Sequence, residues 1–510
     1  MLALAFSAAI TGIDAHIVRV ETDAAAGTPA FAIVGLPDRA LNESRDRVRA
    51  AIINSGFGFP AGRLLVNLAP ADMRKAGVAF DLAIALALLA NDEQLDRTNL
   101  RDYVVCGELA LDGTLRAVPG VLAMTIAAKR AGFARILVPE ANRDEATLVE
   151  GLDVYAVPTL ADAVAVVLGH GAPFRRRGET VLAEPPPDAT GDFSDVRGQV
   201  VAKRALEIAA AGGHNLVLVG PPGCGKTMLA QRLPSILPTM TSAEALDVTK
   251  IYSIAGLLGP RPRVMTTRPF RAPHHTASRV ALVGGNSPPR PGEISLAQCG
   301  VLYLDELGEF PRSTLEVLRQ PLEEGTVTIA RASGTTTFPA RFMLVASMNP
   351  CPCGFRGARG SDCRCDDAAI AKYLAKLSGP LLDRIDLHIT VARVSFDELT
   401  HSAPAETSAV VRARVEAARA RQAARFATTE IATNAAIPAA QVRRCCPLNA
   451  DALALLEGAV TRGALSARAF DRIARVARTI ADLAGSDAIA REHVSEALAY
   501  RGAEGSARAA

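Results

Sequence analysis

Residues 215–227 read NLVLVGPPGCGKT, an apolar run followed by a glycine-rich turn. The run predicts a buried strand over residues 215–219, and the spacing after the turn predicts a helix over residues 228–233. The turn has the pattern G-x-x-x-x-G-K-T, in which backbone N–H groups at a helix N-terminus surround phosphate oxygens. Its members are Gly220, Pro221, Pro222, Gly223, Cys224, Gly225, Lys226 and Thr227. This order of strand, phosphate-binding loop and helix predicts a doubly wound parallel α/β sheet that binds a nucleotide.

The last two residues of the loop indicate a nucleoside triphosphate with a magnesium ion. Lys226 reaches the terminal phosphates and Thr227 offers its hydroxyl to Mg²⁺. Downstream, an apolar run over residues 301–304 ends in Asp305 and Glu306. We expect Asp305 to hold the metal, directly or through water, and Glu306 to act as the catalytic base for the attacking water. A buried strand that simply ends in two solvated acids is the alternative.

A third apolar run, residues 342–347, is followed closely by Asn349 and Pro350. Parallel sheets of this kind bind their ligands at the carboxyl ends of the strands. The Asn349 amide is therefore expected to orient the attacking water. A turn-forming Asn-Pro pair without a catalytic role is the alternative.

Composition and patterning divide the chain. It has 510 residues, a formal net charge of +3 and 49% hydrophobic residues, which excludes a disordered chain and a globally cationic surface. Residues 1–171 alternate short apolar runs with helical patterns and predict an α/β domain, whereas residues 172–192 predict a linker. Residues 193–394 predict the nucleotide-binding α/β domain, and residues 395–510 have helical spacing.

The sequence favours a cytoplasmic protein without a membrane partner. Its longest apolar stretch, residues 78–90, contains Asp81 and is too short to span a bilayer, so it predicts a buried helix. Residues 1–13 are apolar but lack a basic region ahead of them, which favours a strand pair over a targeting signal. Nine cysteines, four of them in one short segment, favour a reducing compartment.

Five further phrases support a family resemblance. They are Asp195-Val196-Arg197-Gly198-Gln199, Gly212-Gly213-His214-Asn215, Phe270-Arg271-Ala272-Pro273-His274-His275-Thr276, Gly292-Glu293-Ile294-Ser295-Leu296-Ala297 and Met348-Asn349-Pro350-Cys351-Pro352-Cys353-Gly354. Over nearly its whole length the chain resembles the AAA+ ATPases, specifically the magnesium-chelatase-like ComM/YifB family. The resemblance implies a homo-hexamer that binds ATP and Mg²⁺ between its subunits.

The resemblance also implies roles for two arginines. Arg384 matches the arginine finger that one subunit supplies to the ATP of its neighbour, where it would stabilise charge on the γ-phosphate. Without the family, a surface salt bridge with Asp383 or Asp386 explains Arg384 equally well. Arg468 matches the lid arginine called sensor 2, with a solvated helix arginine as the alternative.

Two insertions suggest a nucleic-acid partner. The stretch between Lys226 and Asp305 is longer than a minimal nucleotide core needs. It contains Arg261, Arg263, Arg268, Arg271, His274, His275, Arg279 and Arg290. Residues 325–338 predict a β-hairpin. The resemblance implies that both insertions face the ring pore, where basic loops would follow single-stranded or branched DNA without reading its sequence. Packing against neighbouring subunits is the alternative.

A cysteine cluster follows Asn349 with the pattern C-x-C-x9-C-x-C, formed by Cys351, Cys353, Cys363 and Cys365. Four thiolates can hold one tetrahedral Zn²⁺, so the pattern favours a structural zinc site. Reduced buried thiols and a redox pair are the alternatives, because two-residue spacers are commoner in structural zinc sites.

The first domain resembles the proteolytic domain of Lon proteases through Lys75-Ala76-Gly77-Val78-Ala79-Phe80-Asp81, Gly107-Glu108-Leu109, Gly113-Thr114-Leu115 and Val118-Pro119-Gly120. A Lon-type site needs a serine nucleophile and a lysine base. The aligned positions hold Ala79 and Ala123, so we expect this domain to be proteolytically inactive.

Two functions from different classes remain. The family suggests an ATP-driven hexameric DNA motor, a helicase or branch-migration enzyme that acts on recombination intermediates in natural transformation. The alternative is an ATPase that remodels a protein partner, as magnesium-chelatase ATPase subunits do. An active ATP-dependent protease is disfavoured by Ala79.

Overall fold

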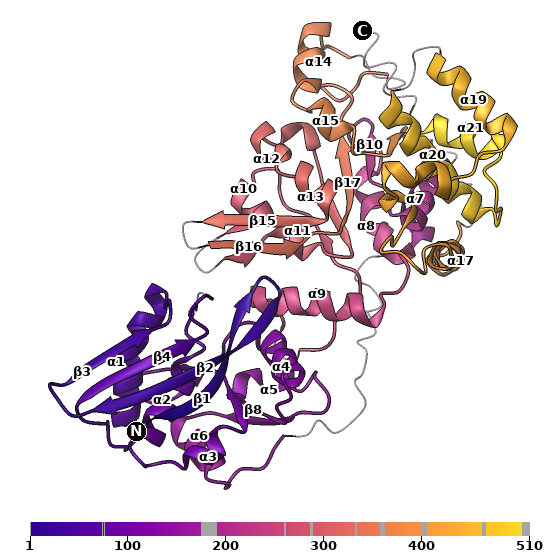
Figure 1. Ribbon diagram of the computed structural model, residues 1–510. Coiled ribbons are helices and arrows are strands. Elements are labelled where there is room, and N and C mark those ends of the chain that lie inside the picture. The colour runs from indigo at the N-terminus through magenta and orange to yellow at the C-terminus, as the bar shows by residue number, and fades with distance from the viewer. Residues whose placement is uncertain are drawn as a thin grey trace.

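The computed structural model has an N-terminal α/β body, a central α/β body and a C-terminal helical body (Figure 1). It describes residues 2–73, 75, 77–174, 191–259, 262–285, 289–331, 334–357, 363–394, 396, 398, 405–461 and 466–501. Most of the predicted linker, residues 175–190, lies outside this range. The predicted fold class, a parallel α/β sheet accompanied by a helical C-terminal region, is confirmed.

The N-terminal sheet has seven strands in the order β3-β4-β2-β1-β5-β8-β9. They are β1 (Ala3–Thr11), β2 (Asp14–Ala25), β3 (Ala30–Val34), β4 (Arg63–Ala69), β5 (Tyr103–Val105), β8 (Arg135–Pro139) and β9 (Asp153–Val157), beside the small pair β6 (Glu108–Leu109) and β7 (Leu115–Arg116). The helices are α1 (Arg39–Asn54), α2 (Asp81–Asn91), α3 (Arg97–Leu100), α4 (Val121–Arg130), α5 (Arg143–Ala146) and α6 (Leu160–Val167), with the 3-10 turn η1 (Glu140–Asn142). β1 and β2 pair antiparallel, which confirms the strand pair predicted for the N-terminal residues.

Helix α2 is the buried helix predicted for residues 78–90, and all its residues are buried. Asp81 opens the helix, and its carboxylate accepts a hydrogen bond of 2.9 Å from Nε of Arg47. This ion pair allows an acidic residue to lie in the core, because a buried charge requires a partner. Among the described residues, no helix combines the length and the apolarity that crossing a membrane requires.

The central sheet is parallel, with the strand order β11-β14-β17-β10-β18. These strands are β10 (Leu216–Val219), β11 (Phe270–Arg271), β14 (Val301–Leu304), β17 (Met343–Met348) and β18 (Leu387–Thr390). Alternate residues of β10 pack into different cores: Leu216 and Leu218 join one hydrophobic cluster, and Val217 joins another. Since both faces of β10 are covered, the strand reads as a continuous apolar run in the sequence.

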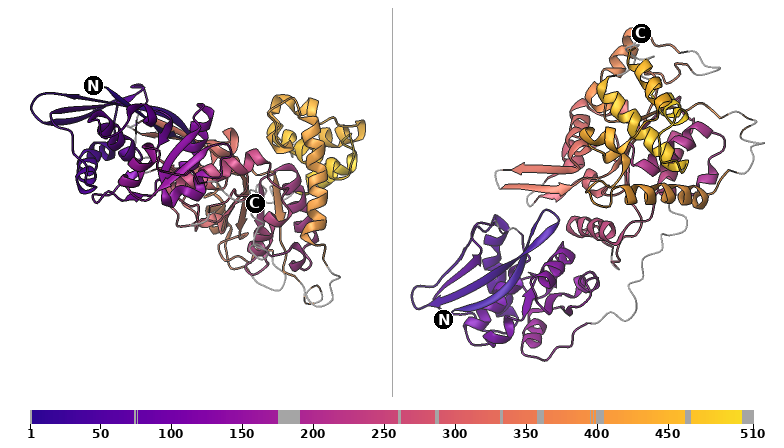
Figure 2. Two further views of the ribbon diagram at one scale, coloured as in Figure 1. Left: turned by 90° about the horizontal axis from the view of Figure 1, so that it is seen from below. Right: turned by 45° about the vertical axis from the view of Figure 1, so that its right-hand side comes forward.

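Helices and turns surround this sheet. They are η2 (Phe193–Asp195), α7 (Val200–Gly212), α8 (Lys226–Ile236), α9 (Ser242–Ala255), α10 (Arg279–Val283), α11 (Glu293–Leu296), η3 (Leu307–Glu309), α12 (Arg312–Glu316), α13 (Arg319–Glu324), α14 (Asp367–Leu374) and α15 (Gly379–Leu382). The short pair β12 (Gly284–Gly285) and β13 (Arg290–Pro291) and the hairpin β15 (Thr326–Arg331) and β16 (Gly334–Pro339) complete the body. Figures 1 and 2 show this hairpin projecting from the central body, as the sequence predicted for residues 325–338.

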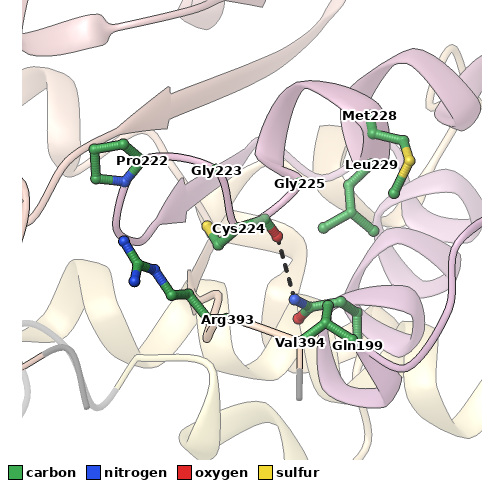
Figure 3. A pocket seen from close by; sticks show the side chains of 9 residues that line it. All are labelled: Gln199, Pro222, Gly223, Cys224, Gly225, Met228, Leu229, Arg393 and Val394. Carbon is green, nitrogen blue, oxygen red and sulfur yellow. Dashed lines mark hydrogen bonds between the residues drawn. The ribbon is translucent and has the colours of Figure 1, made fainter. Parts of the chain in front are cut away.

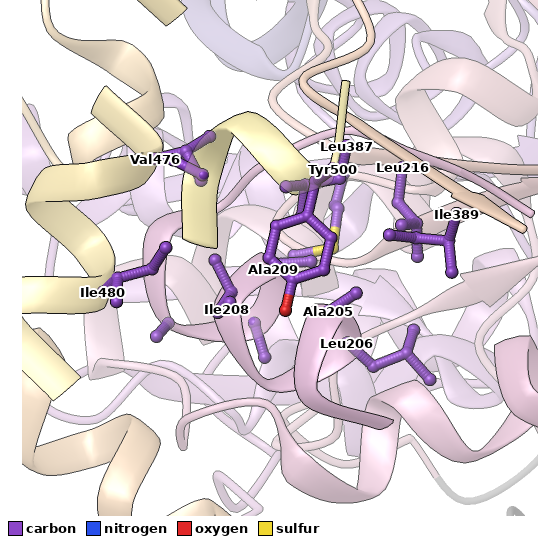
Figure 4. Close-up of a cluster of buried hydrophobic side chains, with 14 of the residues drawn as sticks. Ala205, Leu206, Ile208, Ala209, Leu216, Leu387, Ile389, Val476, Ile480 and Tyr500 are labelled. Carbon is purple, nitrogen blue, oxygen red and sulfur yellow. The ribbon is translucent and has the colours of Figure 1, made fainter. Parts of the chain in front are cut away.

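The C-terminal body contains α17 (Ser408–Arg425), η4 (Asn434–Ala436), η5 (Ala439–Gln441), α18 (Val442–Cys445), α19 (Ala450–Thr461), α20 (Ala467–Leu483) and α21 (Arg491–Ala499). Figure 4 shows α20 packing against α7 of the central body through Val476 and Ile480 on one side and Ile208 on the other. The two bodies therefore share one hydrophobic core.

The N-terminal body docks on the central body through α9, which lies between them (Figure 1). Lys250 of α9 donates to Asp14 over 3.0 Å, and the Gly120 N–H donates to the Ser253 carbonyl over 3.2 Å. The β1–β2 turn lies against the projecting hairpin, because a Cβ at Gly12 would be 2.6 Å from the carbonyl oxygen of Thr337.

Candidate nucleotide site

The phosphate-binding loop joins β10 to α8, and glycine is required at two of its positions. Gly225 has a φ of 89°, a left-handed conformation, directly before Lys226 begins α8. At Gly220 a Cβ would lie 2.3 Å from the carbonyl oxygen of Val391. The chain can therefore turn sharply toward the N-terminus of α8, where N–H groups and the helix dipole favour a phosphate.

The Lys226 ammonium lies inside this loop. It donates to the carbonyl oxygens of Gly220 over 2.7 Å and Pro221 over 3.0 Å, and to Oδ1 of Asn349 over 3.2 Å. The structure thus brings Asn349, from the end of β17, beside the lysine that the sequence assigned to the terminal phosphates.

Thr227 and Asp305 lie side by side. The Thr227 hydroxyl donates to Oδ2 of Asp305 over 3.0 Å, and Ser347 donates to the other carboxylate oxygen. Burial opposes ionisation of Asp305, but hydrogen bonds from Ser347, Tyr303 and Thr227 outweigh it and hold the pKa of Asp305 below its usual value. A hydroxyl and an ionised carboxylate are hard oxygen ligands, so this pair fits Mg²⁺.

Glu306 has an unusual backbone and a partner that sequence reasoning missed. Its φ is 53°, a left-handed conformation that non-glycine residues adopt rarely and that is found at functional sites. Its carboxylate lies 3.3 Å from Nδ1 of His275, which follows β11 on the neighbouring strand. The sequence analysis named His275 as one of eight basic residues and within the family phrase Phe270-Arg271-Ala272-Pro273-His274-His275-Thr276, but did not pair it with Glu306.

Two pockets flank the loop. One, of about 400 Å³, is lined by Thr227, Gln231, Ala272, Pro273, His274, His275, Tyr303, Asp305 and Glu306. The other, of about 450 Å³, is lined by loop residues together with Gln199, Arg393 and Val394 and is drawn in Figure 3. There Gln199 donates from Nε2 to the carbonyl oxygens of Cys224 over 3.3 Å and Ala392 over 2.7 Å, and Arg393 extends toward the loop. Thr227, Asp305 and Glu306 thus line the first pocket, whereas Gln199 and Arg393 line the second.

Arg384 and Arg468 lie in neither pocket. Arg384 forms an ion pair with Glu323 of α13 and donates to the carbonyl oxygen of Pro380. The predicted alternative partners were therefore wrong: Asp383 faces Arg468 at 4.0 Å, and Asp386 accepts from His214 over 3.0 Å. Arg468 is 73% exposed, so its guanidinium is accessible on the surface of the helical body.

The basic residues of the first insertion separate into different environments. Arg268 is bound by Glu244 and by carbonyl oxygens of Pro238 and Cys299, and Arg271 forms a bidentate pair with Glu293. These two arginines therefore stabilise the fold. Three others are exposed, namely Arg263, Arg279 and Arg290, and Arg261 lies outside the described residues.

The four clustered cysteines meet in space. Their Sγ atoms all lie within 4.8 Å of one another. Cys351 is 3.4 Å from Cys353 and 3.6 Å from Cys363. A tetrahedral Zn–S₄ centre with bonds of about 2.3 Å requires S–S separations of roughly 3.8 Å, so the donor set fits a metal of this size.

Comparison with known proteins agrees with this geometry. Residues 192–399 match the family model described as magnesium chelatase, subunit ChlI, residues 405–501 match its C-terminal model, and residues 20–142 match the model described as subunit ChlI of Mg-chelatase. Competence protein ComM of Haemophilus influenzae is 44% identical over 98% of this chain and 97% of its own length. The chain belongs to the ComM/YifB family of magnesium-chelatase-like AAA+ ATPases. The uncharacterised protein YifB of Escherichia coli, also 44% identical with the same coverage, is a further member.

The N-terminal body of this ComM/YifB-family chain has a separate relative. The archaeal Lon protease of Methanocaldococcus jannaschii is 36% identical over 85 residues, which is 17% of this chain and 13% of that protein. The positions that the sequence aligned with the Lon dyad are Ala79 and Ala123, whose side chains are 8% and 2% exposed. Neither residue offers a nucleophile or a base.

Proposed function

We propose that this chain is an ATP-driven motor that assembles as a homo-hexameric ring and acts on single-stranded or branched DNA. Its activity would be that of a helicase or branch-migration enzyme on recombination intermediates. The observation that carries the proposal is the convergence of two basic insertions on the central body, which also holds the nucleotide site. The phosphate-binding loop and the basic surface thus belong to the same central body.

The hydrolytic residues are assigned from their contacts. Lys226 and the loop N–H groups would bind the phosphates, and Thr227 with Asp305 would hold Mg²⁺, which would supply positive charge at the phosphates. Glu306 polarises the attacking water as general base, and the Asn349 amide, beside Lys226, orients that water. ATP and Mg²⁺ are therefore the cofactors of this site.

The ring is proposed from the family match, with Arg384 as the candidate arginine finger. Its guanidinium pairs with Glu323 on α13 rather than lining the pockets of its own subunit. The Arg384 side chain is 11% exposed, so it would have to leave Glu323 to reach the ATP of a neighbouring subunit. Arginine fingers contribute about 10³ to 10⁵ in rate in other phosphoryl-transfer enzymes. Arg468, exposed on the lid near Asp383, would act as sensor 2 from the helical body.

The DNA surface is assigned to Arg279, Arg290 and Arg331, which are exposed. Arg331 ends β15 at the tip of the projecting hairpin, and its Nη2 lies 3.1 Å from a Cβ built at Gly285. Gly285 pairs with Arg290 in the first insertion, so Arg290 and Arg331 lie on adjacent elements. Such a cluster binds phosphates, and the aromatic content of 4% favours binding without sequence preference.

The cellular role is proposed from a relative. The name of the Haemophilus influenzae protein, competence protein, supports a role in natural transformation. DNA recombination and a cytoplasmic location are proposed together with that role. The alternative function, remodelling of a protein partner, is supported by the similarity to the magnesium-chelatase models.

The DNA surface can be tested by binding a fluorescent single strand and a four-way junction at several salt concentrations. The triple variant Arg279→Ala, Arg290→Ala, Arg331→Ala is compared with Arg63→Ala, Arg101→Ala, Arg130→Ala, which removes three exposed arginines of the N-terminal body. Loss of three phosphate contacts should make the fall of log K with log salt less steep, reducing the magnitude of the slope by about 2 for a single strand. Equal binding by the two triple variants would contradict the assignment.

The cysteine cluster is proposed to bind one structural Zn²⁺. The fit of its four Sγ atoms to a tetrahedral centre supports this over reduced thiols or a redox pair. Cys351 is fully buried, as expected for a structural rather than a catalytic metal ligand.

A further inference from the structure

We propose that the metal held by Cys351, Cys353, Cys363 and Cys365 braces the nucleotide site, so that metal occupancy sets the affinity for ATP and the rate of its hydrolysis. The inference rests on the proposed ATPase function and adds a means by which that function depends on a second site. Four contacts of residues 349–357 and 363–376 carry it.

The first contact is along the chain. Cys351 is two residues beyond Asn349, and Asn349 accepts a hydrogen bond of 3.2 Å from Lys226. The Gly354 N–H donates to the Cys351 carbonyl over 2.9 Å, which closes a tight turn directly after Asn349. Fixing Cys351 therefore fixes the end of β17 that presents Asn349.

The second contact is with the phosphate-binding loop itself. Gly354 has a φ of 84°, and a Cβ there would lie 2.7 Å from Cδ of Pro222 and 3.6 Å from Cγ of Asn349. The cysteine turn thus packs against both the loop and the residue that contacts Lys226. A shift of this turn by about one ångström would displace Pro222 and with it the phosphate-binding loop, because packed interiors transmit strain.

The third contact reaches the second pocket. The Arg393 guanidinium lies over the Phe355 ring at 5.6 Å, a cation–π contact. Arg393 lines this pocket, where Figure 3 shows it extending toward Pro222. Phe355 follows Cys353 by two residues, so the cluster also positions this wall of the pocket.

The fourth contact is with the turn that bears the catalytic acid. Helix α14 begins just beyond Cys365, with Asp366 as its N-cap. Its Tyr373 ring packs on Gly308, where a Cβ would lie 2.6 Å from the phenol, and Lys376 donates to the Gly308 carbonyl over 3.0 Å. Gly308 is two residues beyond Glu306.

The cluster therefore connects the two sides of the site. Cys351 and Cys353 lie on the side of the phosphate-binding loop, and Cys363 and Cys365 lead into the helix that supports the Glu306 turn. A metal bound to all four sulfurs cross-links these chain segments, and its loss removes the cross-link while leaving four thiol groups in close contact. Both sides of the nucleotide site then lose their common support.

The test uses the purified full chain. Metal content is measured by elemental analysis, zinc is removed with a zinc-selective chelator under reducing conditions, and Mg²⁺ is kept in excess. Binding of a fluorescent ATP analogue and ATP turnover are then measured in the zinc-loaded, depleted and reloaded protein. We expect about one zinc per chain, an affinity for the analogue at least tenfold weaker after depletion, and recovery on reloading.

Two variants sharpen the result. Cys363→Ser removes a ligand that lies far from Asn349 along the chain and is expected to reproduce the depleted state. Cys299→Ser changes a cysteine outside the cluster and is expected to bind the analogue normally. Phe355→Ala keeps all four ligands and is expected to weaken analogue binding while zinc remains bound.

The outcomes separate this inference from the function on which it rests. If the zinc-loaded protein hydrolyses ATP and the depleted protein binds and hydrolyses it equally well, the proposed effect of the metal is wrong. The proposed ATPase activity is then retained. If the loaded protein binds the analogue without hydrolysing ATP, the ATPase is wrong, and the change in analogue affinity on depletion still decides the brace. A purified chain that neither contains zinc nor takes it up overturns the inference.

Discussion

The hydroxyl of Thr227 donates a hydrogen bond of 3.0 Å to the carboxylate of Asp305, 78 residues further along the chain. Thr227 follows β10 and Asp305 follows β14, two strands separated by β17 in the central sheet. The contact therefore spans the carboxyl edge of the sheet and brings two oxygen ligands to one point. This relationship joins the phosphate-binding loop to the hydrolytic acids.

Removing the Thr227 hydroxyl should disrupt the magnesium site. Thr227→Val keeps the shape of the side chain but lacks the oxygen, so we expect turnover to fall by about a hundredfold and a higher Mg²⁺ concentration to be needed. Thr227→Ser retains the oxygen and should keep most of the activity. Magnesium titrations of ATP turnover measure both effects, and equal titrations for the two variants would contradict the assignment.

His275 should act by positioning Glu306. Its Nδ1 lies 3.3 Å from the carboxylate, so a side chain without an N–H group releases the general base from its orientation. We expect His275→Leu to lower kcat about tenfold with little change in KM, because the contact concerns hydrolysis rather than binding. His275→Asn supplies an N–H donor and should restore much of kcat. A rise in KM at constant kcat would instead show that His275 binds substrate.

Arg384 should act on the neighbouring subunit. Arg384→Ala is expected to bind ATP normally and to lose about 10³-fold or more in turnover. Mixing it with Lys226→Ala should restore part of the activity, since some interfaces then combine an intact loop with an intact Arg384. Arg312→Ala, which removes an exposed arginine of α12, serves as the control. Mixtures that stay as inactive as their components would contradict a role in trans.

The stability of the C-terminal helical body should depend on Asp482. Its buried carboxylate pairs with Arg425 and with Arg478 at 3.1 Å, and it accepts from Asn434 over 2.8 Å. Asp482→Ala leaves two arginines without their anion and should destabilise this body by about 3–5 kcal/mol. Asp487→Ala removes a fully exposed partner of Arg421 and should leave the stability of this body nearly unchanged, because water screens an exposed pair. Hydrogen exchange of the α20 amides measures the change in stability for both variants.

The sequence predicted the parts of this molecule that depend on contiguous residues. The phosphate-binding loop, the acids after β14 and the hairpin were predicted because local spacing determines each of them. The start of α8 was misplaced: it was expected at residue 228, but the helix begins at Lys226, since the end of the loop is also the first helical turn. Boundaries of this kind depend on hydrogen bonds that a propensity pattern does not resolve.

Contacts between distant segments could not be predicted. Glu323 as the partner of Arg384, His275 beside Glu306 and Gly354 against Pro222 each join residues on separate elements. Likewise, the charge pattern did not separate Arg268 and Arg271, which stabilise the fold, from the exposed Arg279 and Arg290. Only the packing of the elements determines which arginine finds a carboxylate.

The most direct test of the motor is ATP hydrolysis with and without single-stranded, duplex and four-way-junction DNA at two salt concentrations. Lys226→Ala is the blank, because it removes the ammonium from the phosphate-binding loop. We predict that DNA stimulates turnover, that stimulation falls as salt rises, and that the blank shows neither. Turnover that is lost in the blank yet indifferent to every DNA would contradict the DNA motor and indicate a protein client.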